Sequence, residues 1–259
     1  MKSRYLLMIG LIAFGLSLIA TAPAATLYGW LAPKEPPPLI QPSGLSGSLF
    51  KGQAELLRYL QRPVLSGLSW ELEAMSLLTG RLAYRLLARD PQLPLAGRVA
   101  IGLGGAHIDD FKMAGGIRAL AAIAGQPFVP VNGQAALDLR RLRLEQGWPR
   151  DAEGSLQVVG LAWTLARDPV ALGDFEASFT REQDDLVSLI RTLSGPLDLN
   201  GDARLKADRS YELHLQLRPK PDAPPMVQNL VRSIGTADAQ GYFHIRRQGQ
   251  MPVAASATP

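Results

Sequence analysis

The sequence has 259 residues, of which 47% are hydrophobic and 19% are charged, so it suits a packed globular protein and argues against global disorder. The formal net charge is +4, with Lys2 and Arg4 at the N-terminus and acids interspersed with bases elsewhere, which argues against a nucleic-acid-binding protein. The chain has no cysteine, which excludes thiol catalysis, thiolate metal sites and disulfides.

An uncharged segment follows the basic N-terminus. Residues 5–22 contain neither a charged residue nor a proline. A helix of that length spans about 27 Å, close to the thickness of the bilayer hydrocarbon. Tyr28 and Trp30 suit the far interface. We therefore expect a cytoplasmic tip over residues 1–4 and one transmembrane signal anchor over residues 5–25, which places a single-pass protein in the inner membrane with its bulk in the periplasm.

A cleaved signal peptide is the alternative interpretation of this segment. Both Ala20-Thr21-Ala22 and Ala22-Pro23-Ala24 fit a small-x-small cleavage site. The apolar run is longer than a usual signal-peptide core, which favours the retained anchor. Both interpretations export the remainder of the chain, and whether cleavage occurs stays open.

Proline and alternation divide the rest of the chain. Five prolines between Pro33 and Pro42 predict a stiff periplasmic spacer over residues 26–43. Short alternating runs then predict a periplasmic β-rich domain over residues 44–250. The small, apolar residues 251–259 predict a disordered tail.

The clearest alternating run is residues 211–218, where Leu213, Leu215 and Leu217 share one side with Tyr211. This pattern predicts a half-buried antiparallel strand, and it leaves open whether the leucines face a core or an uncovered groove. In the run over residues 135–144 the leucines change phase near Arg140-Arg141, which predicts a β-bulge.

Glycines divide these runs, and three short segments have helical spacing. We expect turns at Gly97, Asn132-Gly133, Gly154, Asn200-Gly201 and Gly241. We expect helices over residues 117–124, 180–193 and 224–234. The predicted fold is mainly β: an antiparallel, strongly curved meander sheet of ten or more strands, in one layer or as two stacked β sub-regions, with two or three short helices after the N-terminal transmembrane helix.

The sequence has no recognisable catalytic constellation. His107 and Asp109 would share a strand face with Asp110 next to them, but no second histidine lies nearby, so a polar turn explains these residues better than a metal site. No nucleophile elbow or phosphate-binding loop is present. We assign no catalytic, cofactor-binding or metal-binding residue and no cofactor, and expect a protein that is not an enzyme.

The order of several motifs resembles the type II secretion system protein N family, also called general secretion pathway protein N. Gly47-Ser48-Leu49-Phe50-Lys51-Gly52 follows the anchor and spacer, and alternating runs with glycines and tryptophans follow in the family's order. Phe50 is a departure, because tryptophan is expected there. The residues that carry the resemblance are Gly47, Leu49, Phe50, Gly52, Trp70, Gly80, Gly154, Trp163, Gly173 and Gly241.

The resemblance implies an accessory inner-membrane component of the machinery that exports folded proteins from the periplasm. Its partners would be other type II secretion components, in the inner-membrane platform or the outer-membrane secretin, with membrane lipid around the N-terminal helix and no nucleic acid. A membrane-anchored periplasmic lipid-handling β protein is the alternative, because a curved sheet with one apolar face can hold acyl chains. The direct partner, the stoichiometry and the secreted cargo stay open.

Overall fold

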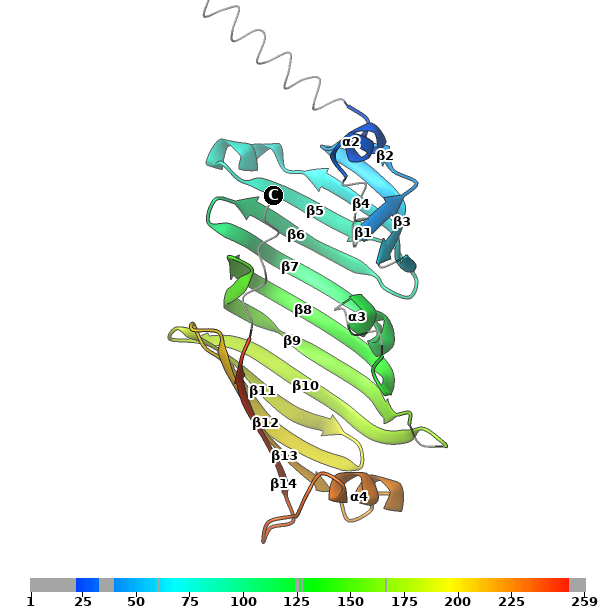
Figure 1. The fold of residues 1–259 in the computed structure, drawn as a ribbon, viewed down its shortest axis with the longest axis vertical. Helices are drawn as coiled ribbons and strands as arrows, with labels where there is room; N and C mark the ends of the chain where they lie inside the picture. Colours follow the sequence, from blue (N-terminus) through cyan, green and yellow to red (C-terminus); the bar gives the residue numbers. More distant parts are fainter. Residues whose placement is uncertain are drawn as a thin grey trace, which may run out of the picture. The chain divides into compact units, whose positions relative to one another are not determined.

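The computed structural model describes residues 22–32, 40–59, 61–123, 126, 128–165 and 167–251. Fourteen strands follow one another in an open sheet whose order is that of the sequence, except that β2 pairs beside β3 (Figure 1). The strands are β1 (Ile40–Ser43), β2 (Ser46–Gly47), β3 (Lys51–Tyr59), β4 (Arg62–Leu72), β5 (Leu82–Ala88), β6 (Leu95–Gly102), β7 (Gly105–Gly116), β8 (Val131–Glu145), β9 (Trp148–Trp163), β10 (Val170–Glu182), β11 (Asp185–Ser194), β12 (Leu197–Leu205), β13 (Ser210–Pro219) and β14 (Phe243–Gln250).

Within the described residues, four short helical elements accompany the strands: α2 (Ala24–Leu31), the 3₁₀ helix η1 (Ala74–Thr79), α3 (Ile117–Ile123) and α4 (Pro225–Arg232). The chain forms two compact units that meet in the sequence between Arg98 and Val99. The predicted mainly-β antiparallel fold with few helices is confirmed, because the strand pairs run antiparallel in both units.

Small side chains form the buried centre of the first unit. Ala54 and Ala83 are 1% and 0% exposed, and Leu93 is 1% exposed. The loop that carries Leu93 is held by Asp90, whose carboxylate accepts hydrogen bonds from the Ser66 hydroxyl at 2.6 Å and from the Leu93 amide at 3.1 Å. The Ser66 hydroxyl bond is the largest cause that lowers the pKa of Asp90, so this carboxylate stays ionised while it holds the loop.

Helix α4 covers part of the sheet in the second unit. Val227 and Val231 are 0% and 1% exposed, and they pack in one cluster with Leu217 of β13 and Phe243 of β14. Prolines at 224 and 225 start the helix where no backbone donor is needed. The helices expected over residues 117–124 and 224–234 are therefore confirmed as α3 and α4.

The helix expected over residues 180–193 is wrong. These residues form the end of β10, a turn at Gln183-Asp184 and strand β11. Leucine and isoleucine at positions 186, 189, 190 and 193 suit a helical stripe, but Leu186, Ser188 and Ile190 also share one face of a strand. The segment pairs with β10 on one side and with β12 on the other, which provides hydrogen-bond partners for its backbone. This long-range pairing favours the strand over the helix.

Most of the glycine turns expected from the sequence are also wrong. Gly97, Gly133, Gly154 and Gly201 lie inside strands rather than between them. A Cβ atom on Gly154 would lie 2.2 Å from the Asp138 carbonyl oxygen, so this glycine allows a close strand approach. The β8–β9 hairpin instead turns at Gln146-Gly147, where both residues have positive φ.

Three other expectations lie wholly or partly inside the described residues. The bulge expected near Arg140-Arg141 is confirmed by a register shift between Leu139 and Arg141. Strand β1 begins at Ile40, inside the segment expected to be a spacer. The predicted membrane helix lies outside the described residues except for its end, where α2 begins at Ala24, and among the described residues no helix is long and apolar enough to cross a bilayer.

Candidate functional site

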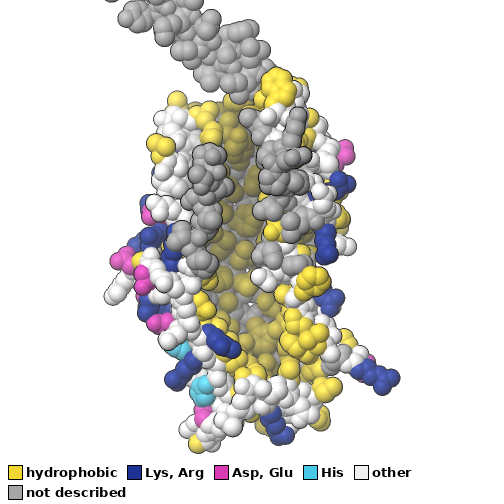
Figure 2. Space-filling model, viewed as in Figure 1, with side chains coloured by type: hydrophobic (Ala, Val, Ile, Leu, Met, Phe, Trp, Pro, Cys, Tyr) yellow, Lys and Arg dark blue, Asp and Glu magenta, His cyan; other side chains and the backbone are white. Residues whose placement is uncertain are grey.

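An apolar hollow of about 460 Å³ opens on one face of the sheet in the second unit. Figure 2 shows hydrophobic side chains gathered on this face, in the lower half of the view. Six neighbouring strands, from β8 to β13, supply its wall, so it is a feature of the sheet face rather than of a single loop. The wall includes Leu137, Leu139, Ala152, Phe179, Leu186, Ser188, Ala203, Leu205, Tyr211 and Leu213.

One row of cross-strand partners runs through the hollow. The residues that face one another from β8 to β13 are Leu139, Gly154, Phe179, Ser188, Ala203 and Leu213. Directly paired residues point to the same face of a sheet. If the pairing of a strand shifted by one residue, every side chain of that strand would turn to the opposite face. The apolar wall therefore depends on this register.

The sheet of the second unit curls around the hollow. In a flat sheet, β9 and β12 would be about 14 Å apart, since neighbouring strands are spaced by about 4.8 Å. Yet Arg150, at the start of β9, donates a hydrogen bond from Nη1 to the carbonyl oxygen of Ala207, just after β12, at 3.1 Å. The Arg209 guanidinium also lies over the Trp148 ring, 5.4 Å from its centroid. These contacts bring the β8–β9 and β12–β13 hairpins together at one end of the hollow.

The same sheet face is covered at its other end by α4. Leu213, Leu215 and Leu217 alternate along β13 and share this face. Leu217 is buried in the cluster with α4 and Leu215 packs against that cluster, whereas Leu213 lines the hollow. The sequence left open whether the leucines of β13 face a core or an uncovered groove. Both occur, because the covered core and the uncovered hollow lie over consecutive parts of this strand.

Charged side chains line the end of the hollow near the β12–β13 turn. Arg204 pairs with Asp185 at 3.2 Å and with Glu182 at 3.4 Å. Lys206 donates a hydrogen bond to Glu212 at 2.5 Å, which raises the pKa of the lysine and lowers the pKa of the glutamate. These groups form three ion pairs at neutral pH, in which two cations face three carboxylates.

Two arginines at the rim have no ion-pair partner among the described residues. Arg247 on β14 is paired in register with Leu213, which puts it on the face of the hollow, and it is exposed. Arg209 lies two residues before Tyr211 in the turn. Within the described part of the chain, the ion pairs include neither Arg209 nor Arg247. Arg209 and Arg247 therefore supply two guanidinium groups at the rim, where Asp208, held by the Ser210 hydroxyl at 2.6 Å, is a further carboxylate.

Strand β14 is the last strand of the sheet and pairs with β13 alone among the described strands. The outer backbone N–H and C=O groups along its eight residues have no partner strand within the described part of the chain, which makes β14 an open edge there. The face opposite the hollow carries His244, Arg246 and Gln248. His244 lies 2.7 Å from Asp238, and this hydrogen bond is the largest cause that lowers the pKa of the Asp238 carboxyl group.

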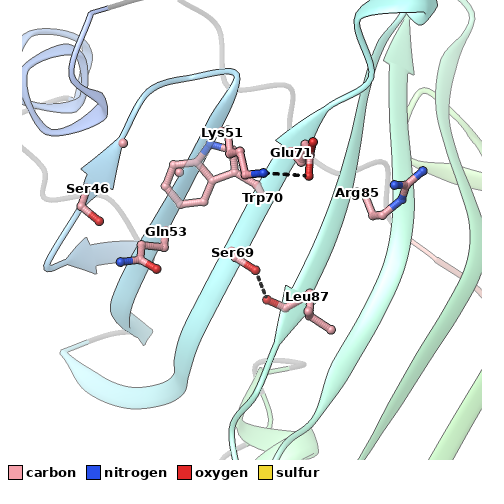
Figure 3. Close-up of a pocket in the computed structure, with 10 residues that line it drawn as sticks. Ser46, Lys51, Gln53, Ser69, Trp70, Glu71, Arg85 and Leu87 are labelled. Atoms are coloured by element: carbon pink, nitrogen blue, oxygen red, sulfur yellow. Dashed lines mark hydrogen bonds and ion pairs between the residues drawn. The ribbon is translucent and has the colours of Figure 1, made fainter.

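Three of the residues that suggested the family, Gly47, Gly52 and Trp70, line a recess of the first unit. Figure 3 shows this recess, which has a volume of about 390 Å³, with the Trp70 ring beside strand β3. Trp70 donates from Nε1 to the Ser48 carbonyl oxygen at 3.1 Å. A Cβ atom on Gly52 would lie 2.5 Å from this ring, and one on Gly47 would lie 2.4 Å from the Lys51 carbonyl oxygen. The two glycines therefore allow the tight β2–β3 hairpin to pack on the tryptophan.

The remaining family-motif residues are spread over both units. Leu49 and Phe50 are partly buried in the β2–β3 turn, and Gly80 ends η1 in a left-handed conformation with φ of 69°. In the second unit, Trp163 packs against the α4 cluster, Gly173 lies at a register shift of β10, and Gly241 lies in the turn before β14. Their placement indicates structural roles in strand packing and turns, and only Gly154 lies in the row that crosses the hollow.

The polar residues considered as metal ligands do not form a site. His107 is paired across the strands with Arg143, and Asp109 is paired with Arg141. The described residues contain no group of three or more histidine and acidic side chains that could hold a metal ion. Arginines opposite these residues instead indicate the polar outer surface of a hairpin.

The model of the family described as "Type II secretion system (T2SS), protein N" matches residues 38–246, which span both units. The chain belongs to this protein N family. It is similar to the type II secretion system protein N of Vibrio cholerae, with 27% identity over 232 residues that cover 85% of this chain and 89% of the relative. It is also similar to protein N of Aeromonas hydrophila, with 28% identity over 228 residues that cover 83% of this chain and 86% of the relative.

No solved structure matches this chain. Family membership confirms the resemblance stated from the motifs and supports a role in type II secretion. The motif residues lie mostly in turns and close strand contacts, whereas the sequence offered an uncovered groove only as one alternative for the leucines of β13 and did not indicate the rest of the wall. The alternation on β13 was the sequence pattern that pointed to this face. Phe179, Ala203 and Leu213 come from three different strands, and the sequence does not show the register that brings them together.

Proposed function

We propose that this protein N family member is an accessory inner-membrane component of the type II secretion machinery that acts without catalysis, through protein–protein contacts. The N-terminal segment would hold it in the membrane and the sheet would stand in the periplasm. The observation that carries the proposal is the open edge of β14 in a member of a secretion family. Its outer backbone groups can pair with an extended segment of another component, as in β-strand addition.

The side chains next to this edge select the kind of segment that would bind. Arg246 and Arg247 lie on opposite faces of β14 and neither belongs to an ion pair among the described residues. A partner strand with an acidic residue on either face would gain a cross-strand ion pair. We therefore expect a polar, acidic extended segment from another secretion component.

A secretion assay tests the role in the machinery. We expect deletion of the gene to leave cargo enzymes in the periplasm and the full chain to restore their export. A version in which a cleavable signal peptide replaces residues 1–24 tests the anchor, and we expect it to reach the periplasm and restore export poorly, because it is no longer held at the membrane. Normal export in the deletion strain would overturn the proposed role.

Site-specific photocrosslinking tests the edge strand. A photoreactive amino acid in place of Gln248 on β14 should capture another secretion component in living cells. The matched control replaces Gln157, which is exposed on the central strand β9 and has paired strands on both sides. Equal capture from the two positions, or none from Gln248 in cells that secrete normally, would overturn strand addition at β14.

A further inference from the structure

The hollow of the second unit is an apolar sheet face that α4 leaves uncovered. We propose that it binds an acyl chain of an anionic phospholipid, with Arg209 and Arg247 near the phosphate. Its volume of about 460 Å³ lies in the range of about 300–1,000 Å³ for small-molecule sites. The site uses the inner face of the sheet, whereas the proposed protein contact uses the outer edge of β14, so neither proposal depends on the other.

The backbone of the wall favours a hydrocarbon over a peptide. Each wall strand from β8 to β13 pairs with a neighbour on both sides. The backbone groups of the wall are thus already used in the sheet. A peptide in the hollow would leave its own N–H and C=O groups without partners in apolar surroundings, which costs free energy. An acyl chain has no such groups.

The C-terminal residues of the chain itself are poorly suited to fill the hollow. The Met251 side chain lines it, and residues 252–259 follow. Those eight residues are alanine, serine, threonine and proline apart from Val253. By contrast, α4 covers the neighbouring part of the face with Val227 and Val231, together with Leu230. The C-terminal residues supply too little apolar surface to do the same.

Two arginines at the rim favour an anionic headgroup. The nearby Arg204 and Lys206 are already paired with Asp185, Glu182 and Glu212, and the Asp208 carboxylate accepts from the Ser210 hydroxyl. Arg209 and Arg247 add two guanidinium groups that carry no ion pair among the described residues, and guanidinium groups bind phosphate through two parallel hydrogen bonds. An apolar wall with these two arginines at its rim matches an acyl chain joined to a phosphate.

Photolabelling with a defined lipid tests the site. The full chain is reconstituted into vesicles of phosphatidylethanolamine and phosphatidylglycerol that contain phosphatidylglycerol with a diazirine on one acyl chain. After illumination, peptide mapping by mass spectrometry separates labels in the hollow from labels in the N-terminal segment. We expect labels on peptides that contain Phe179, Ala203 or Leu213. Absence of label from all of these peptides would overturn the proposal.

Two substitutions in the wall make the test specific. Ala203→Trp fills the hollow and Ser188→Glu places a charge in it, and we expect each to reduce hollow labelling about tenfold. Leu189→Trp is the control, because Leu189 lies next to Ser188 on the opposite face and is 56% exposed. Circular dichroism and urea unfolding identify any variant that does not fold, and two wall variants keep the test valid if one fails. Unchanged labelling in a folded wall variant would overturn the proposal.

Two further experiments test the anionic headgroup and residues 252–259 as a competing occupant of the hollow. Arg247→Glu should reduce labelling by phosphatidylglycerol about tenfold relative to a matched phosphatidylcholine probe, while Arg246→Glu on the opposite face should not. Equal labelling by the two probes in the unsubstituted chain would overturn the anionic headgroup. Label that enters the hollow only after residues 252–259 are removed would show that the C-terminal residues occupy it and would overturn the lipid site.

Discussion

Two parts of one sheet face in the second unit differ in what lies over them. At one end, Leu217 and Phe243 are buried beneath α4, and Val227 of the helix is fully buried. At the other end, Leu213 and Phe179 line a hollow that no described helix covers. Both ends have the same alternation and similar side chains. The difference shows that an amphipathic strand prescribes an apolar face, while the element that covers this face is decided elsewhere in the chain.

The largest expected effect comes from disrupting the covered end. Val227→Asp would bury a carboxylate that has no partner, and we expect it to lower the free energy of unfolding by more than about 4 kcal/mol. Urea unfolding of the full chain in detergent measures the effect. Met226→Asp is the matched control, because Met226 is 51% exposed on the same helix, and we expect a change within about 0.5 kcal/mol. Equal losses would contradict the covering role of α4.

Two leucines of β13 lie at the covered and the uncovered end of the same face. Leu217→Ala should lower the free energy of unfolding by about 2–5 kcal/mol, because it leaves a cavity in a closed cluster. Leu213→Ala should cost only about 1 kcal/mol, because the removed atoms are already partly open to solvent. The two variants share the residue type, the strand and the face. The same urea midpoint for both would show that the hollow is as well packed as the covered end.

A smaller effect is expected at the turn that borders the hollow. Arg209→Ala removes the guanidinium from the face of Trp148 and should cost about 0.5–1 kcal/mol, with a change in tryptophan fluorescence. Arg209 has a positive φ of 71°, and alanine keeps the same backbone strain. Gln183→Ala is the control, since Gln183 has φ of 57° in another hairpin turn and no ring contact is found there among the described residues. Unchanged fluorescence in Arg209→Ala would argue against the stacked arrangement.

The smallest expected effect is the acid sensitivity of the turn after α4. The hydrogen bond from His244, followed by that from the Tyr242 amide, lowers the pKa of Asp238 in the folded chain below its ordinary value of 3.8. A lowered carboxyl pKa stabilises the fold above the unfolded pKa, and this contribution is lost as pH falls through the folded pKa. As the pH falls from about 5 to about 2, we therefore expect the free energy of unfolding to decrease less in Asp238→Asn than in the unsubstituted chain. An identical pH profile for the two proteins would contradict this role.

Particular segments show how far sequence reasoning reaches. The alternation of residues 211–218 predicted β13 because its period of two has no helical counterpart. The spacing of residues 180–193 fits both a helix and a strand, and strand pairing on both sides decided for β11. The glycines at 154 and 201 resembled turns but serve close strand approach, since a Cβ atom on either would lie 2.2 Å from a neighbouring carbonyl oxygen. The hollow could not be predicted, because its wall depends on the register of six strands.

Motif order, alternation and proline or glycine boundaries are local properties, and they were enough to predict the family, the mainly-β class and the helices α3 and α4. The strand register, the glycines that lie inside strands and the part of the apolar face that receives a helix became known from the folded chain alone. The physical reason is that each of these outcomes depends on free energy shared between distant segments. Strand pairing and the burial of a face are gained only when both partners are in place.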